Sequence, residues 1–123
     1  MKSILIVEDE AQMRTMLSKV LARGGYKVVE AKNGDEGMRL FRAQPADLVI
    51  TDLIMPGKKG LELIAELKRE FPQTKMIAIS GGGWRVDDEE YLSAAEKLGV
   101  DYSLSKPFQN ETLLSMVNDL LKR

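Results

Sequence analysis

The sequence contains no cysteine and no histidine. The first absence excludes disulfides and thiol nucleophiles, and the second excludes imidazole bases. Together they exclude most zinc and other transition-metal sites. Any chemistry must therefore use oxygen and amine groups. Oxygen ligands favour Mg²⁺, Mn²⁺ or Ca²⁺ if a metal is bound, so the search for a site turns to the carboxylates.

An excess of charge of either sign is also missing. The 18 lysines and arginines nearly balance the 19 aspartates and glutamates. No strong overall field would therefore draw the protein to nucleic acid or to an anionic membrane. We expect no direct nucleic-acid partner.

Long apolar runs are absent as well. The first one, residues 4–7, ends at Glu8, which is too short for a signal peptide or a transmembrane span. We expect no membrane insertion and a cytoplasmic protein. With 123 residues and no low-complexity linker, the chain is long enough for one well-buried core and too short for two ordinary domains. We therefore expect a single domain, residues 1–123.

What is present is an alternation of short apolar runs with helical patterns. The runs have the composition of buried strands, and they lie at residues 4–7, 28–29, 48–50, 76–79 and, more weakly, 102–104. Between and after them, apolar residues at spacings of three and four predict five helices. The first helix ends at Gly24-Gly25, the second opens at a capping box of Asn33 and Glu36, and the fourth covers about residues 88–98.

Apolar strands that alternate with helices predict a parallel sheet with helices on both faces and right-handed crossovers. The fold class is therefore α/β. In such sheets ligands bind beyond the carboxyl ends of the strands. The residues that directly follow each apolar run are the first candidates for a functional site.

These candidates share one edge of the predicted sheet. Glu8 and Asp9 follow the first run, Asp52 the third, Ser80 the fourth and Lys106 the fifth. Carboxylates without a counterion repel one another, whereas Mg²⁺ binds carboxylates together with water and a phosphate oxygen. One carboxylate would then be free to attack phosphorus, while the metal, an ammonium and N–H donors stabilise the charge.

The same residues stand in motifs that resemble the bacterial response-regulator receiver domain of two-component signalling, over essentially the whole chain. The motifs are Val7-Glu8-Asp9-Glu10, Asp52-Leu53-Ile54-Met55-Pro56-Gly57, Ser80-Gly81 and Lys106-Pro107-Phe108. The resemblance is to the single-domain type, similar to the chemotaxis regulator. It implies a flavodoxin-like, doubly wound sheet of five parallel strands in the order 2-1-3-4-5, with five helices.

The resemblance also implies the roles of the acidic residues. Asp52 would be the phosphoacceptor. Glu8, Asp9 and Asp52 would hold Mg²⁺, or Mn²⁺ in its place, directly or through water. The backbone carbonyl of Ile54 would complete the protein ligands.

The phosphoryl-binding and switch residues implied by the resemblance are Ser80, the Gly81 backbone and Lys106. The Lys106–Pro107 bond would be cis, although only about 5% of X-Pro bonds are cis in folded proteins. The phosphoryl donor would be a sensor histidine kinase or a histidine phosphotransfer protein. A downstream effector protein would bind the face made by helix 4, strand 5 and helix 5.

Simpler interpretations stay open at this point. Asp9 with Gln12 would make an ordinary capping box for the first helix, and the other candidates, taken singly, are typical of turns or of the surface. One alternative function is a receiver-like interaction module that works without phosphorylation, although the intact acidic cluster argues against it. Another is an aspartate-nucleophile phosphohydrolase. The dehalogenase type of that enzyme has an Asp-x-Asp motif, whereas Asp52 is followed by Leu53 and Ile54.

Two features depart from the receiver pattern. Receiver domains commonly have an aromatic residue three positions before the lysine, and here that residue is Ser103. Tyr102 should point to the opposite face of the strand, so it cannot simply take over the aromatic switch. The glycine-rich loop after Ser80 contains Trp84, the only tryptophan. We expect this loop to reorganise with the phosphorylation state and Trp84 to report it.

Overall fold

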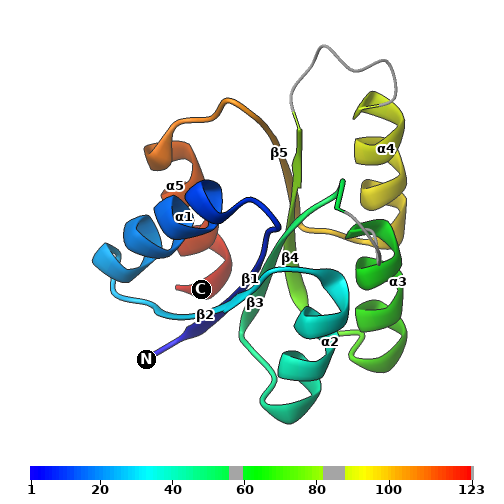
Figure 1. Ribbon diagram of the computed structural model, residues 1–123, viewed down its shortest axis with the longest axis horizontal. Coiled ribbons are helices and arrows are strands. Elements are labelled where there is room, and N and C mark those ends of the chain that lie inside the picture. Colours follow the sequence, from blue (N-terminus) through cyan, green and yellow to red (C-terminus); the bar gives the residue numbers. More distant parts are fainter. Residues whose placement is uncertain (56–59, 82–87, 123) are drawn as a thin grey trace.

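Strands and helices alternate regularly in the computed structural model, which describes residues 1–55, 60–81 and 88–122 (Figure 1). The elements are β1 (Ser3–Val7), α1 (Ala11–Arg23), β2 (Lys27–Ala31), α2 (Gly34–Ala43), β3 (Leu48–Asp52), α3 (Gly60–Glu70), β4 (Lys75–Ser80), α4 (Asp88–Leu98), β5 (Tyr102–Ser105) and α5 (Asn110–Leu121). The strands form one parallel sheet in the order β2-β1-β3-β4-β5. The predicted α/β class, strand order and five helices are confirmed.

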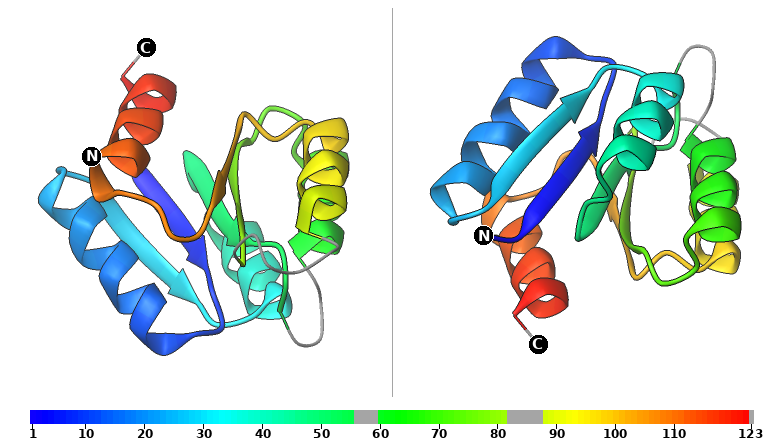
Figure 2. Two further views of the ribbon diagram at one scale, coloured as in Figure 1. Left: turned by 90° about the horizontal axis from the view of Figure 1, so that it is seen from above. Right: turned by 90° about the horizontal axis from the view of Figure 1, so that it is seen from below.

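The helices form a layer on each face of the sheet (Figure 2). Helices α1 and α5 pack on one face, where Leu17 and Leu113 belong to the same buried cluster. Helices α2, α3 and α4 cover the other face through residues such as Met38 and Leu63. In the part of the chain that the structure describes, no helix is both long and apolar enough to cross a membrane.

Helices cover both faces of the sheet, which explains why the strands are continuous apolar runs in the sequence. In β1, Ile4 and Ile6 face the cluster with α1 and α5, whereas Leu5 and Val7 face the cluster with α2, α3 and α4. All four side chains are at most 2% exposed. Burying each contributes about 1.5–3 kcal/mol relative to leaving it in water. In β1, β3 and β4 the buried polar side chains lie at or next to the carboxyl end, which is where the site lies.

The predicted helix ends agree with the structure, with one difference at α2. The Asn33 side chain accepts a hydrogen bond from the Glu36 backbone N–H at 2.8 Å. The Glu36 carboxylate accepts from the Lys32 N–H at 3.0 Å rather than from that of Asn33. After α1 the backbone turns at Gly25, whose φ of 93° is favourable for glycine.

A close approach fixes α3 against the end of β3. The Gly60 N–H donates to the Leu53 carbonyl oxygen at 3.2 Å. A Cβ atom at Gly60 would lie 2.1 Å from the Asp52 carbonyl oxygen and 2.6 Å from the Leu53 Cα. Only glycine allows α3 to begin this near to Asp52.

Candidate functional site

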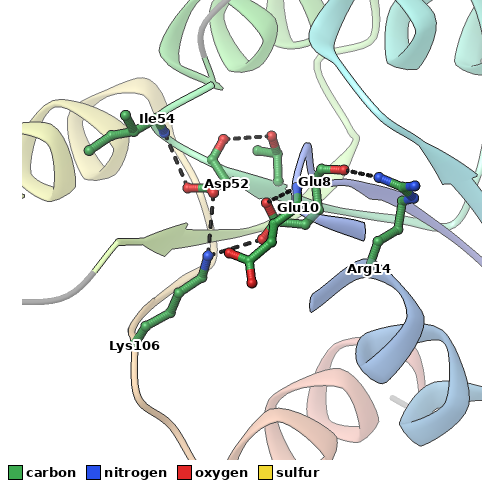
Figure 3. A network of polar contacts seen from close by, with 7 residues as sticks. Glu8, Glu10, Arg14, Asp52, Ile54 and Lys106 are labelled. Atoms are coloured by element: carbon green, nitrogen blue, oxygen red, sulfur yellow. Dashed lines mark hydrogen bonds and ion pairs between the residues drawn. The ribbon is translucent and has the colours of Figure 1, made fainter. Parts of the chain in front are cut away.

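The predicted site residues come together at the carboxyl ends of the strands. Glu8 and Asp9 follow β1, and Asp52 is the last residue of β3. Ser80 ends β4, and Lys106 follows β5. Figure 3 shows Glu8, Asp52 and Lys106 directed toward one another from three separate segments.

The three acidic side chains form one cluster. Glu8, Asp9 and Asp52 each offer a carboxylate oxygen, and these oxygens all lie within 4.8 Å of one another. Glu8 is only 1% exposed and Asp52 6%, whereas Asp9 is exposed. The cluster is thus buried on one side and open to solvent on the other.

The electrostatics of this cluster favour a cation. Burial, together with the nearby Asp52 carboxylate, raises the pKa of Glu8 from 4.5 to about 7, against the opposing effect of Lys106. A buried carboxylate beside a second carboxylate is destabilised when it is ionised, and additional positive charge nearby would stabilise it. Three carboxylate oxygens at such a spacing are the ligands that a hard divalent cation prefers. The residues present therefore fit a Mg²⁺-type ion.

Lys106 supplies the positive charge that the protein itself brings to the cluster. Its Nζ lies 3.0 Å from Glu8 Oε1 and 3.4 Å from Asp52 Oδ2. Burial disfavours the charged amine, but the carboxylates of Asp52 and Glu8 outweigh burial and raise the pKa of Lys106. Lys106 is therefore a firmly charged ammonium in direct contact with both acids.

The other oxygen of Asp52 is held by the loop after β3. Ile54 donates its backbone N–H to Asp52 Oδ1 at 3.2 Å. The contact between Ile54 and Asp52 is therefore made by the Ile54 backbone N–H. A metal-binding role for the Ile54 carbonyl stays a prediction.

The Ser80 hydroxyl contacts a different group from the carboxylates. Ser80 is 1% exposed, and its Oγ donates to Ser105 Oγ at 3.3 Å. Gly81 is exposed, and a Cβ there would meet nothing within 4 Å among the residues that the structure describes. The Lys106–Pro107 peptide bond is cis, the isomer that the resemblance implies.

The capping interpretation of Asp9 is wrong. The residue that precedes α1 is Glu10, and its side chain makes no capping hydrogen bond. Asp9 lies one residue further from the helix. Its carboxylate groups with Glu8 and Asp52 instead.

Residues 4–118 match the family model of the response regulator receiver domain. The chain belongs to this family. Except for Ser3, the first residue of β1, the match covers the strands, and it covers all the predicted site residues, so the fold, the acidic cluster and the family agree.

Individual relatives of this receiver chain fall into two kinds. It is 33% identical over 122 residues to the chemotaxis protein CheY of Thermotoga maritima, covering 98% of each chain. It is 32% identical over 123 residues to the transcriptional regulatory protein AfsQ1 of Streptomyces coelicolor, covering 100% of this chain but 52% of that protein. It therefore spans about half the length of AfsQ1 and nearly the whole of CheY.

A solved receiver structure agrees closely with this chain. The response regulator protein TrrA of Thermotoga maritima, solved in complex with Mg²⁺-BeF, superposes with a TM-score of 0.86 at 33% identity. The alignment covers 98% of this chain and 100% of TrrA.

The departure at the aromatic position is visible in the contacts of β5. Ser103 Oγ donates to Glu96 Oε1 of α4 at 3.4 Å. Tyr102 packs on the cluster with α1 and α5, and its hydroxyl donates to Asp119 at 2.5 Å. The two side chains therefore lie on opposite faces, as predicted. Trp84, the expected loop reporter, lies outside the described residues, as do Pro56 and Gly57 of the motif after β3.

Two polar residues at the site were not found from the sequence. Arg14 donates through a terminal guanidinium nitrogen to the Glu8 backbone carbonyl at 2.8 Å. Ser105 contacts Ser80 because the two residues are register partners on β4 and β5. From the sequence alone, Arg14 would be interpreted as an ordinary cation on a helix surface. Ser105 would be interpreted as a hydroxyl at the end of a strand. Neither had a local signal that pointed to its partner.

Proposed function

We propose that this receiver domain is a phosphorylation-dependent signalling switch, which accepts a phosphoryl group on Asp52 with Mg²⁺ and then alters its contacts with other proteins. The observation that supports it most is the meeting of three carboxylate oxygens within 4.8 Å, two of the acids being in contact with one ammonium. This set combines a nucleophile, ligands for a cation and a fixed positive charge.

The proposed transfer uses a histidine phosphoramidate as donor, from a sensor histidine kinase or a histidine phosphotransfer protein. A carboxylate oxygen of Asp52 forms a bond to phosphorus. The bond between phosphorus and the histidine nitrogen breaks, and its electron pair stays on the nitrogen. Mg²⁺, or Mn²⁺ in its place, would be held by Glu8, Asp9, Asp52 and the Ile54 carbonyl, and it would neutralise charge on the phosphoryl group.

The remaining site residues would bind the phosphoryl oxygens. Lys106 already contacts Asp52, so its ammonium is in position to donate to a group attached there. We assign Ser80 and the Gly81 N–H to the same task. For Ser80 this requires its hydroxyl to leave Ser105.

The output would be a change at the surface made by α4, β5 and α5, which an effector protein would recognise. The Ser103–Glu96 contact joins β5 to α4 within this surface. We also propose that residues 1–123 form one domain and act in the cytoplasm. The neighbouring structure of TrrA with Mg²⁺-BeF supports the metal requirement by analogy.

Intact-mass measurement after incubation with acetyl phosphate and Mg²⁺ tests the proposal. One added phosphate is expected, no addition is expected in Asp52→Asn, and EDTA should stop the reaction. An unchanged rate in Asp52→Asn, or with EDTA, would refute the assignment.

The intact-mass assay and a phosphomonoester turnover assay together separate the two alternative functions. A protein that never gains phosphate while it keeps its fold would be a binding-only module. Repeated turnover of a phosphomonoester would indicate a phosphohydrolase.

A further inference from the structure

The loop between β1 and α1 places two of the three clustered carboxylates, and it is fixed at several points. The Glu8 N–H donates to the Ala31 carbonyl at 3.0 Å, and the Arg14 N–H donates to the Glu10 carbonyl at 2.9 Å. The Glu10 N–H donates to Glu8 Oε2 at 3.3 Å. Side chains from outside the loop hold it as well: the Arg14 guanidinium contacts the Glu8 carbonyl, and the Lys106 ammonium contacts the Glu8 carboxylate.

Arg14 uses its guanidinium in two directions. One terminal nitrogen donates to the Glu8 carbonyl at 2.8 Å, and Nε lies 3.3 Å from Glu30 Oε1 on β2. The Arg14 side chain is 21% exposed and that of Glu30 is 45% exposed. A planar guanidinium holds two acceptors in fixed relative positions, which a lysine ammonium does less well. Figure 3 shows Arg14 reaching from α1 to the backbone of Glu8.

The carbonyl that Arg14 contacts belongs to the peptide unit that joins Glu8 to Asp9. The orientation of this unit sets the direction in which the Asp9 side chain leaves the backbone. Asp9 is exposed, so packing does little to fix it. Glu8, by contrast, is buried and is also held by Lys106. Loosening this peptide unit would therefore move Asp9 away from the other two carboxylates.

We propose that Arg14, held by Glu30, is a positioning residue that orients the Glu8–Asp9 peptide unit and thereby the carboxylates that bind the divalent cation. This inference rests on the proposed function, because it concerns the same Mg²⁺ site. It assigns Arg14 no contact with the metal or with the phosphoryl group.

Loss of the Arg14 charge and loss of its positioning role predict opposite effects on the affinity for Mg²⁺. Coulomb's law predicts that removing a positive charge near a cation site strengthens Mg²⁺ binding. Loss of positioning predicts weaker binding, because residues that orient metal ligands typically account for about 10–100-fold in metal affinity. The direction of the change therefore identifies the role.

The test is titration of the ¹⁵N-labelled full chain with Mg²⁺ alone, following amide chemical shifts, with circular dichroism to verify folding. Arg14→Met is expected to weaken Mg²⁺ binding about tenfold. The matched control, Lys19→Met, removes one positive charge from the exposed side of the same helix. It is expected to leave the affinity unchanged or slightly stronger.

Two charge-conserving variants test the same contact without altering the net charge. Arg14→Lys cannot hold both acceptors, and Glu30→Asp withdraws its carboxylate from Arg14. Each is expected to weaken Mg²⁺ binding, by less than the roughly tenfold expected for Arg14→Met. In an Arg14→Met background, Glu30→Asp should have no further effect, because Glu30 acts through Arg14.

The outcomes separate this inference from the proposed function. A wild-type chain that binds no Mg²⁺ would refute both. If the wild type binds Mg²⁺ and Arg14→Met binds it equally well or better, the inference alone is wrong. Fully additive effects of Arg14→Met and Glu30→Asp would also refute it. If Arg14→Met does not fold, an unchanged affinity in both Glu30→Asp and Arg14→Lys would still overturn it.

Discussion

Replacing Gly60 by alanine tests how closely α3 packs against Asp52 at the end of β3. The new Cβ would lie 2.1 Å from the Asp52 carbonyl oxygen and 2.9 Å from the Asp52 carbonyl carbon. Both are backbone atoms, which cannot move aside as the end of a flexible side chain can. Either α3 or the end of β3 must shift.

The net magnitude follows from two opposing effects. Overpacking in a well-packed region costs about 1–3 kcal/mol, and occasionally more. Alanine is favoured over glycine within a helix by about 1 kcal/mol, and by less at Gly60, the first residue of α3. Because the clash involves backbone, we expect the cost to prevail. The net loss should be about 2 kcal/mol, or roughly 8 °C in melting temperature for a domain of this size.

Thermal unfolding followed by circular dichroism measures this loss. Gly81→Ala is the matched control, because a Cβ there would meet no atom of the described part of the chain within 4 Å. It should melt within a degree or two of the wild type, by the usual size of unobstructed surface changes. A Gly60→Ala protein that melts at or above the wild-type temperature would show that the close approach to Asp52 imposes no constraint.

The other predictions concern separate parts of the molecule. Lys106→Ala should bind Mg²⁺ as well as the wild type or slightly better in an amide-shift titration, because its ammonium competes with the cation for Glu8 and Asp52; a collapse of the affinity would contradict this. Burial raises the pKa of Tyr26 above 10, so the folded state holds the phenol proton more tightly than the unfolded chain. The stabilisation is complete below pH 10 and is lost as the pH rises through the higher folded pKa. Tyr26→Phe should remove this alkaline decrease in urea-unfolding experiments and lose about 1 kcal/mol at neutral pH with the hydrogen bond to Asn118; an identical alkaline profile would refute the assignment. Arg42→Met should lower the melting temperature slightly at low salt and not at 1 M salt, because Arg42 is a surface cation paired with acids of α3; a difference that persists at 1 M salt would show that lost packing, not charge, is responsible.

Much of the site could be predicted because parallel α/β sheets place their strand ends together. Glu8, Asp52, Ser80 and Lys106 were each identified as the residue that follows or ends an apolar run, and the structure puts all four at one edge. The prediction for Asp9 needed the structure to choose between two possibilities. Its position in the sequence is compatible both with a helix cap and with the acidic cluster. The start of α1 at Ala11 decides for the cluster.

Contacts across long sequence separations were beyond sequence reasoning. The ammonium of Lys106 reaches Glu8 across 98 positions of the chain. Ser80 and Ser105 are paired by the register of β4 and β5. The raised pKa of Glu8 depends on how completely the folded chain buries it and on the nearby Asp52 carboxylate.

The sequence by itself determined the α/β class, the strand order implied by its motifs and the chemical types gathered at the site. The class and the chemical types could be predicted because apolar periodicity and the residues that follow each apolar run are local properties of the chain, whereas the strand order came from the resemblance to the receiver domain. Only the tertiary structure decided that Arg14 holds the Glu8 carbonyl, that Ser80 is bonded to Ser105 and that Gly60 lies against Asp52. These contacts depend on distances of a few ångströms between separate elements, and such distances are fixed by packing of the whole core.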